Sequence, residues 1–127
     1  MEKITKQIIQ DFISTTKIDL LPTQKRLCLP IINRMYRKMS AGIAFSAIKV
    51  DGNLIGDGHH RYLAALLANY PIEKTPTFST SATILIEWES VLFEDEDWDT
   101  TAKINMLNNQ DAEYNNMPIS QIFDLLK

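Results

Sequence analysis

The chain has 127 residues, of which 45% are hydrophobic and 23% are charged, and this is the ordinary composition of one globular domain with one core. Its net charge of -3 argues against strong nonspecific binding of nucleic acid by the whole surface. Its single cysteine, Cys28, excludes an internal disulfide, and one Cys with two adjacent His is a poor set of ligands for structural zinc. No apolar run reaches the length of a membrane span, and charges interrupt residues 1–12 where a secretory signal would be apolar, so we expect a cytoplasmic protein without a membrane partner.

Two amphipathic helices are predicted in the first third of the chain. Apolar side chains recur at helical spacing over residues 3–14, and Pro22 disfavours helix just before it. A second helix is predicted over residues 27–42, because Pro30 suits a first turn and Gly42 suits the position just past the last turn. Its expected buried stripe is Ile31, Ile32, Met35, Tyr36 and Met39.

A hairpin followed by a helix is predicted in the middle of the chain. Residues 44–50 indicate a strand, the tight-turn sequence at residues 51–53 follows it, and residues 54–58 indicate a short second strand. Residues 59–70 are predicted to be helical, and residues 70–78 to form a loop with a short strand at most.

The last third of the chain is predicted to contain one strand and two helices. Residues 82–88, with a nearly continuous apolar run, are the strongest strand candidate in the sequence. An acidic loop follows, and Asp99 or Thr100 is expected to cap a helix over residues 101–110. A terminal helix is expected to bury Ile119, Ile122, Phe123 and Leu126. The order of elements predicts a single small mixed α/β domain of the α+β type over residues 1–127.

Charge is unevenly divided along the chain. Residues 1–74 contain 11 Lys and Arg against 6 Asp and Glu, whereas residues 75–127 contain 2 against 10. An acidic half of this kind is most often a solvated face. The alternative is a docking surface for a basic protein, as in an immunity or antitoxin-like inhibitor that is not an enzyme.

The stretch Gly56 to Arg61 predicts an anion site at the start of a helix. The first N–H groups of a helix have no intrahelical partner, and they attract negative charge. Gly56 and Gly58 allow a ligand to approach the backbone, Arg61 offers a planar set of donors, and His59 and His60 supply donors or a base near neutral pH. Phosphate is the natural guest of such a site.

Each residue of this stretch also has a purely structural interpretation. Asp57 could cap the helix instead of holding a Mg²⁺ that accompanies a nucleotide or orienting a histidine. His60 could be a packed core histidine, and Arg61 could be a surface ion-pair partner. The spacing alone does not decide between these interpretations and a phosphate site.

Residues 48–68, "IKVDGNLIGDGHHRYLAALLA", resemble the signature of the ParB/sulfiredoxin superfamily. In that family a strand, a turn and a short strand lead to a phosphate-binding helix start. The resemblance extends over residues 18–88, which leaves residues 94–127 as an acidic helical extension. It implies a mixed sheet flanked by helices, with nucleotide as the ligand and Mg²⁺ accompanying a nucleoside triphosphate.

The resemblance also implies roles for individual residues. Gly58, His60 and Arg61 would form the phosphate-binding core beside Gly56, and Asp57 matches an acidic position that is a candidate metal ligand. Thr23, Gln24, Lys25 and Arg26 would approach the nucleotide from the family's first box. Candidate catalytic residues are His59, His60 and Asp57.

The sequence departs from the family at His59. Sulfiredoxin has its nucleophilic cysteine at this position, and the partition proteins and free-serine kinases have a glutamate there. Sulfinic-acid repair and chromosome segregation are therefore not expected. Nucleotide hydrolysis, phosphate transfer and nuclease activity remain open as reactions, and nucleic acid remains open as a partner, although few carboxylates are present to activate a water through a metal.

Overall fold

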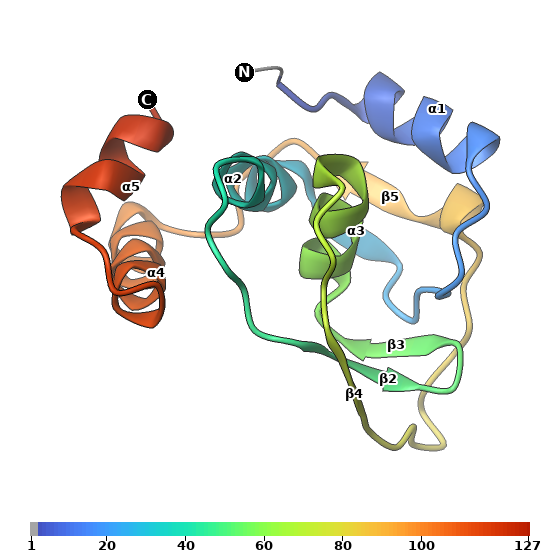
Figure 1. Cartoon of the computed structure of the whole chain (residues 1–127). Coiled ribbons are helices and arrows are strands. Elements are labelled where there is room, and N and C mark those ends of the chain that lie inside the picture. Colours follow the sequence, from blue (N-terminus) through green and yellow to red (C-terminus); the bar gives the residue numbers. More distant parts are fainter. Residues whose placement is uncertain (1–2) are drawn as a thin grey trace.

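The computed structural model describes residues 3–127, and it shows a small mixed α/β fold, as predicted (Figure 1). The helices are α1 (Lys6–Thr15), α2 (Leu29–Ser40), α3 (His59–Ala68), α4 (Thr101–Tyr114) and α5 (Ile119–Leu125), with a 3-10 turn, η1 (Trp88–Ser90). The strands are β1 (Arg26–Cys28), β2 (Ile48–Asp51), β3 (Leu54–Asp57), β4 (Lys74–Pro76) and β5 (Leu92–Glu94). Among these described helices, none has the length and apolar character needed to cross a membrane.

Two small sheets organise the chain. The larger has the order β3-β2-β4, in which β2 is antiparallel to β3 and parallel to β4. The predicted turn at residues 51–53 joins β2 to β3, and Gly52 has a φ of 60° there. In the smaller sheet β1 pairs in parallel with β5, from a distant part of the chain. The smaller sheet thus joins the two halves of the sequence.

The main core lies between the larger sheet and the helices. α2 and α3 pack against each other, and small buried residues on α3, Ala64 and Ala65, allow their close approach. Ile48 and Ile55 of the sheet are fully buried against this pair. A second, smaller cluster of Ile43, Ala112 and Ile122 joins α4 and α5 to the end of α2. Figure 1 shows α4 and α5 set to one side of the sheet, with α2 between them and α3.

Helix ends follow the capping rules that the sequence suggested. The Thr100 hydroxyl accepts a hydrogen bond from the Lys103 N–H at 3.1 Å, so Thr100 rather than Asp99 caps α4. Ala41 and Gly42 follow the end of α2, and Gly42 adopts a φ of 87°. At the other end Leu27 and Cys28 belong to β1, so α2 begins two residues later than predicted.

The predicted strand over residues 82–88 is wrong. Residues 83–87 have no regular structure, and Ile84 and Leu85 are 69% and 50% exposed. The segment is anchored at two points instead of along a ladder: the Ile86 N–H donates to the Pro22 carbonyl at 2.9 Å, and the Trp88 indole N–H donates to the Leu20 carbonyl at 2.8 Å. A strand is found a few residues further along the chain instead, at β5, where it pairs in parallel with β1.

The burial predicted for the terminal helix is partly wrong. Ile122 is fully buried in the smaller cluster, and Ile119 and Leu126 are partly buried beside it. Phe123, however, is exposed. α5 has only seven residues, and it packs against α2 and α4 with one side. Phe123 does not belong to that side.

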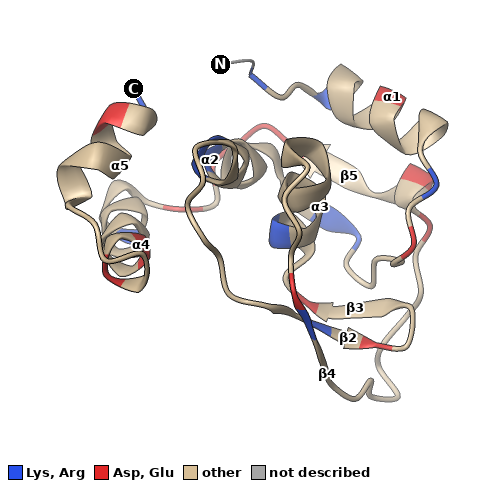
Figure 2. Cartoon of the chain, in the orientation of Figure 1, with Lys and Arg blue, Asp and Glu red and all other residues tan. Residues whose placement is uncertain are grey.

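Internal ion pairs join the basic first part of the chain to its acidic second part; Figure 2 shows where the residues of each charge lie along the ribbon. Five pairs join a cation of residues 1–74 to a carboxylate of residues 75–127: Lys6–Asp95, Arg26–Glu94, Arg34–Asp97, Arg34–Asp99 and Lys38–Asp111. The hydrogen bond from Arg34 lowers the pKa of Asp97. Much of the acidic stretch 94–99 is therefore satisfied within the chain and attaches the second half of the chain to the first.

We expect Asp111→Ala to cost about 3 kcal/mol of unfolding free energy, because it leaves the Lys38 ammonium buried without its counter-charge. The Lys38 side chain is 5% exposed and lies 2.6 Å from Asp111. Asp124→Ala is the matched control, because its pair with Lys127 is exposed and should cost less than about 1 kcal/mol. Urea denaturation measures both, and equal costs would contradict the buried-pair interpretation.

Candidate functional site

A single residue, Gly58, connects β3 to α3. It adopts a left-handed conformation with a φ of 97°, and its carbonyl accepts the first helical hydrogen bond, from the Tyr62 N–H at 2.8 Å. The N–H groups of His59, His60 and Arg61 consequently find no acceptor within residues 3–127. The predicted start of the helix is thus confirmed, and it presents unpaired backbone donors.

The space around Gly58 admits no side chain. A Cβ at this position would lie 2.6 Å from Ile48 Cγ2 and 2.9 Å from the Arg61 guanidinium. Gly56 has a different role, since it lies in β3 and a Cβ there would contact Thr77 of the segment after β4. Of the two glycines in the motif, only Gly58 shapes the helix start.

His59 is buried and binds the backbone of the segment before β1. The Thr23 N–H donates to its Nε2 at 2.9 Å, and the Thr23 hydroxyl donates to the Ile55 carbonyl at 2.7 Å. Burial lowers the pKa of His59 to about 4, so the ring is neutral at pH 7. The Nε2 lone pair that a general base would use is therefore occupied by the Thr23 amide.

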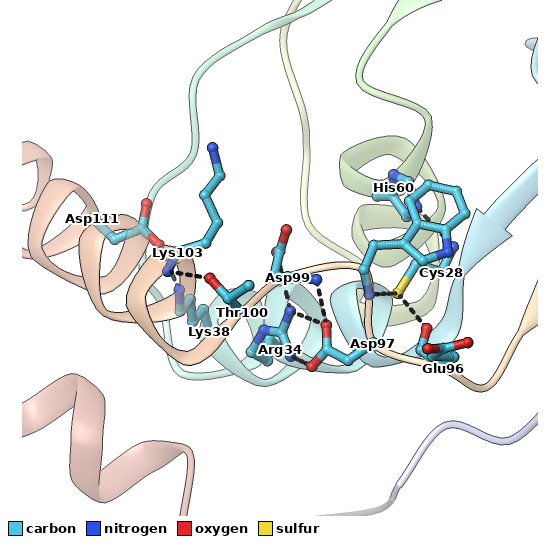
Figure 3. A network of polar contacts seen from close by, with 11 residues as sticks. Cys28, Arg34, Lys38, His60, Glu96, Asp97, Asp99, Thr100, Lys103 and Asp111 are labelled. Carbon is cyan, nitrogen blue, oxygen red and sulfur yellow. Dashed lines mark hydrogen bonds and ion pairs between the residues drawn. The ribbon is translucent and has the colours of Figure 1, made fainter.

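His60 makes the equivalent contact with β1. The Cys28 N–H donates to its Nε2 at 2.9 Å (Figure 3). The ring meets Trp98 edge to face, with centroids 5.4 Å apart. Burial lowers the pKa of His60, also to about 4. Both histidines thus face inward and attach residues 23–28 to α3, which is the structural role that the sequence left open for His60.

Arg61 alone of the three faces a cavity. The cavity has a volume of about 290 Å³ and lies between α2, α4 and residues 44–46. The guanidinium Nη2 donates to the Ala47 carbonyl at 3.3 Å and lies 3.8 Å from Asp57. Its Nη1 has no partner among residues 3–127, and the side chain is 23% exposed, so Arg61 retains donors that face the cavity.

The other cations on the cavity wall are already paired. Arg34 binds Asp97 and Asp99 at 2.6 and 3.2 Å, and Lys38 binds Asp111 at 2.6 Å (Figure 3). The positive charge of these two side chains is largely compensated by these carboxylates. Of the cations that line this cavity, Arg61 is the one best able to bind an anion.

Of the predicted site residues at positions 23–26, only Thr23 contacts the start of α3. Thr23 is brought to His59, and Gln24 is half-buried beside it in the chain. Lys25 and Arg26 are exposed; the Lys25 carbonyl accepts from the Leu92 N–H, and the Arg26 side chain pairs with Glu94 at 3.6 Å. No contact of the last two with the start of α3 is found in the described chain.

Asp57 is the predicted metal ligand, and its side chain is 67% exposed. No cluster of three or more His, Cys, Asp or Glu suited to a metal occurs in residues 3–127. A Mg²⁺ ion needs few protein ligands when phosphates supply the others, so a single carboxylate fits an ion that arrives with a nucleotide. It does not fit a metal held by the protein alone.

Sequence reasoning missed the contribution of α4 to the cavity, including two buried or half-buried polar residues, Asn108 and Asp111. A signal was present, because these polar residues interrupt the apolar helical spacing of Ile104, Leu107 and Ala112. A polar residue on the inward face of a helix indicates either a buried partner or a ligand. For Asp111 the partner is Lys38.

No protein-family model matches the chain, and comparisons with curated proteins and with solved structures found no significant match.

Gly58→Ala should destabilise the fold by more than Gly42→Ala. Both positions have positive φ, where an alanine costs about 1–2 kcal/mol. Only at position 58 does the new methyl group also overlap Ile48 and Arg61, which adds about 1–3 kcal/mol, whereas nothing lies within 4 Å of a Cβ at position 42. Urea denaturation of the two variants measures the difference, and equal losses would show that the start of α3 is not tightly packed.

Stability should fall as the pH is lowered from 6.5 toward 4. The pKa values of both histidines are about 4 in the fold and near 6.5 in the unfolded chain, so the unfolded state binds more protons within this window. The stabilisation is complete above pH 6.5, and it is lost at about 1.4 kcal/mol per pH unit for each histidine. The chain has only these two histidines. Denaturation at several pH values should give a slope that His59→Gln halves, and a flat profile from pH 7 to pH 5 would contradict the burial of both rings.

Proposed function

We propose that this chain is a nucleotide-binding domain of the ParB/sulfiredoxin type, in which the phosphates bind at the start of α3. The observation that supports this most directly is the position of Arg61, a partly exposed arginine in the first turn of α3, where three backbone N–H groups are unpaired. A helix start with an arginine in its first turn combines a positive dipole, neutral donors and a planar charged donor. Phosphate matches this combination because it is both charged and rich in acceptors.

The proposal concerns binding rather than turnover. General-base catalysis needs an accessible lone pair with a pKa near the working pH. His59 and His60 have neither, since each Nε2 accepts a backbone N–H and each pKa is about 4. Asp57 is the remaining candidate base and the only motif carboxylate that could reach a Mg²⁺ carried by the phosphates. Nucleotide hydrolysis, phosphate transfer and nuclease activity therefore have weaker support than binding.

Docking of a basic protein on the acidic half is the second candidate, and the ion pairs do not favour it. Of the five acidic residues in the stretch 94–99, Glu94, Asp95, Asp97 and Asp99 are paired with cations of the same chain. A partner would have to displace Lys6, Arg26 and Arg34 to reach these carboxylates. The charge reversal that would test docking would also break these internal contacts.

Calorimetric titration with ATP, CTP and GTP, each with and without Mg²⁺, tests the nucleotide site. The wild type should show saturable binding that weakens as salt is raised, because phosphate recognition is electrostatic. Arg61→Ala should weaken binding at least tenfold, and Arg61→Lys should only partly restore it because an ammonium lacks the planar fork. Circular dichroism and a thermal melt establish that each variant is folded.

Arg37→Ala is the matched control for the arginine variants. Arg37 lies on α2, and its guanidinium donates to the carbonyls of Leu126 and Lys127, away from α3. It should bind nucleotide as the wild type does. The absence of heat with every nucleotide from folded wild type, or equal binding by Arg61→Ala, would refute the proposed function.

A further inference from the structure

Asp57 is the last residue before the Gly58 junction, and its carboxylate has no structural role among residues 3–127. The helix α3 has Gly58 as its N-cap and receives no capping hydrogen bond from a side chain. The Asp57 side chain is 67% exposed, and its ion pair with Arg61 Nη2 has a length of 3.8 Å, too long for a hydrogen bond. The capping role that the sequence allowed for Asp57 is thus not realised, and the reason for an acidic residue here lies elsewhere.

An acidic residue at this position opposes the binding of a bare anion. Asp57 lies beside the guanidinium of Arg61 and precedes the unpaired N–H groups of the proposed phosphate site. Charges at such separations near a protein surface change a binding constant by roughly fivefold or more. His59 and His60 do not offset the carboxylate, because burial lowers their pKa values to about 4 and both rings are neutral at pH 7. Lys49 is the partner of Asp57 in the β2–β3 ladder, but it is exposed and forms no ion pair within the described chain. Asp57 therefore cancels part of the attraction that Arg61 provides.

We infer that Asp57 makes this site selective for a polyphosphate that carries a divalent cation, such as the Mg²⁺ complex of a nucleoside triphosphate, over the free anion. This inference rests on the proposed function, because it names the form in which the same ligand is bound. An exposed carboxylate is a ligand that Mg²⁺ prefers. Toward the cation-bound form Asp57 is attractive, and toward the free anion it is repulsive, while Arg61 attracts the phosphates of both.

The cation arrives with the phosphates rather than residing in the protein. No group of three or more His, Cys, Asp or Glu suited to a metal occurs in the part of the chain that the structure describes, so Asp57 has no companion ligands. Mg²⁺ commonly binds proteins through one or two carboxylates when phosphates and waters supply its other ligands. Asp57 thus distinguishes a polyphosphate that already carries a cation from one that does not.

Calorimetric titration of Asp57→Asn tests this selection. The probes are ATP, CTP, GTP and inorganic tripolyphosphate, each with Mg²⁺ and with EDTA at the same ionic strength, so that general screening by salt is constant. The wild type should bind the Mg²⁺ form of its best probe about tenfold more tightly than the free anion. Asp57→Asn should bind the free anion about fivefold more tightly than the wild type does, and it should gain little from Mg²⁺. Asp57→Glu, which keeps the carboxylate, should retain the preference for the Mg²⁺ form.

Asp124→Asn is the matched control, because it removes the same charge from a similar setting. The Asp124 side chain is 71% exposed and lies 3.2 Å from Lys127 of the same helical turn. It belongs to α5, which α2 separates from α3 (Figure 1). Its titrations should match those of the wild type, so a general effect of net charge would appear in both variants and a local effect only in Asp57→Asn.

Other outcomes would overturn the inference in distinguishable ways. If Asp57→Asn keeps the preference for the Mg²⁺ form, or binds the free anion no better than the wild type, Asp57 does not select the cation-bound form, although the phosphate site stands. Saturable binding of Mg²⁺ alone to the wild type would show a resident metal instead of one that arrives with the ligand. If neither form of any probe binds to folded wild type, the proposed function and the inference fail together.

Discussion

The junction of one glycine between β3 and α3 is the constraint from which the other features of this site follow. Because Gly58 occupies a left-handed conformation, the helix begins without any intervening loop. Successive helical residues point about 100° apart, so three adjacent side chains are directed to three different places. His59 reaches Thr23, His60 reaches Cys28, and Arg61 reaches the cavity. The adjacent basic residues of the sequence therefore form two internal contacts, and the third lines a cavity.

The two halves of the chain are complementary in charge as well as in packing. Cations on α1, β1 and α2 meet carboxylates that follow or lie within β5 and α4. Exposed pairs of this kind contribute little singly, but the Arg34 and Lys38 side chains are only 19% and 5% exposed. Lys38 joins α2 to α4 through Asp111, and Arg34 joins α2 to the segment just before α4, so both pairs lie at the wall of the cavity between these helices.

The features predictable from sequence were those determined by neighbouring residues. The turn at residues 51–53, the helix after Gly58 and the cap at Thr100 depend on local backbone preferences, and all three are present. The strand predicted at residues 82–88 failed because apolar composition cannot reveal whether a neighbouring edge exists. β1 and β5 were missed for the same reason, since each is three residues long and forms only through the other.

The site was predicted less completely than the fold. Spacing placed Gly58 and Arg61 at the start of a helix, but it could not show that both histidines would accept backbone N–H groups from residues 23 and 28. That arrangement depends on the path of a segment more than thirty residues earlier in the chain. The contribution of α4 to the cavity depends likewise on distant packing, although the polar interruption at Asn108 was visible in the sequence.

The parallel pairing of β1 with β5 has a consequence for the order in which the chain folds during synthesis. The hairpin of β2 and β3 needs only adjacent residues and can form as soon as they leave the ribosome. β1 emerges earlier, but it must wait for residues 92–94 to be translated before its hydrogen bonds can form. Until then the apolar residues Leu27 and Cys28, fully buried in the finished fold, have no strand to pair with. The nascent chain thus passes through a long interval in which an unpaired apolar segment is exposed, and this is the interval in which chaperones or aggregation would act on it.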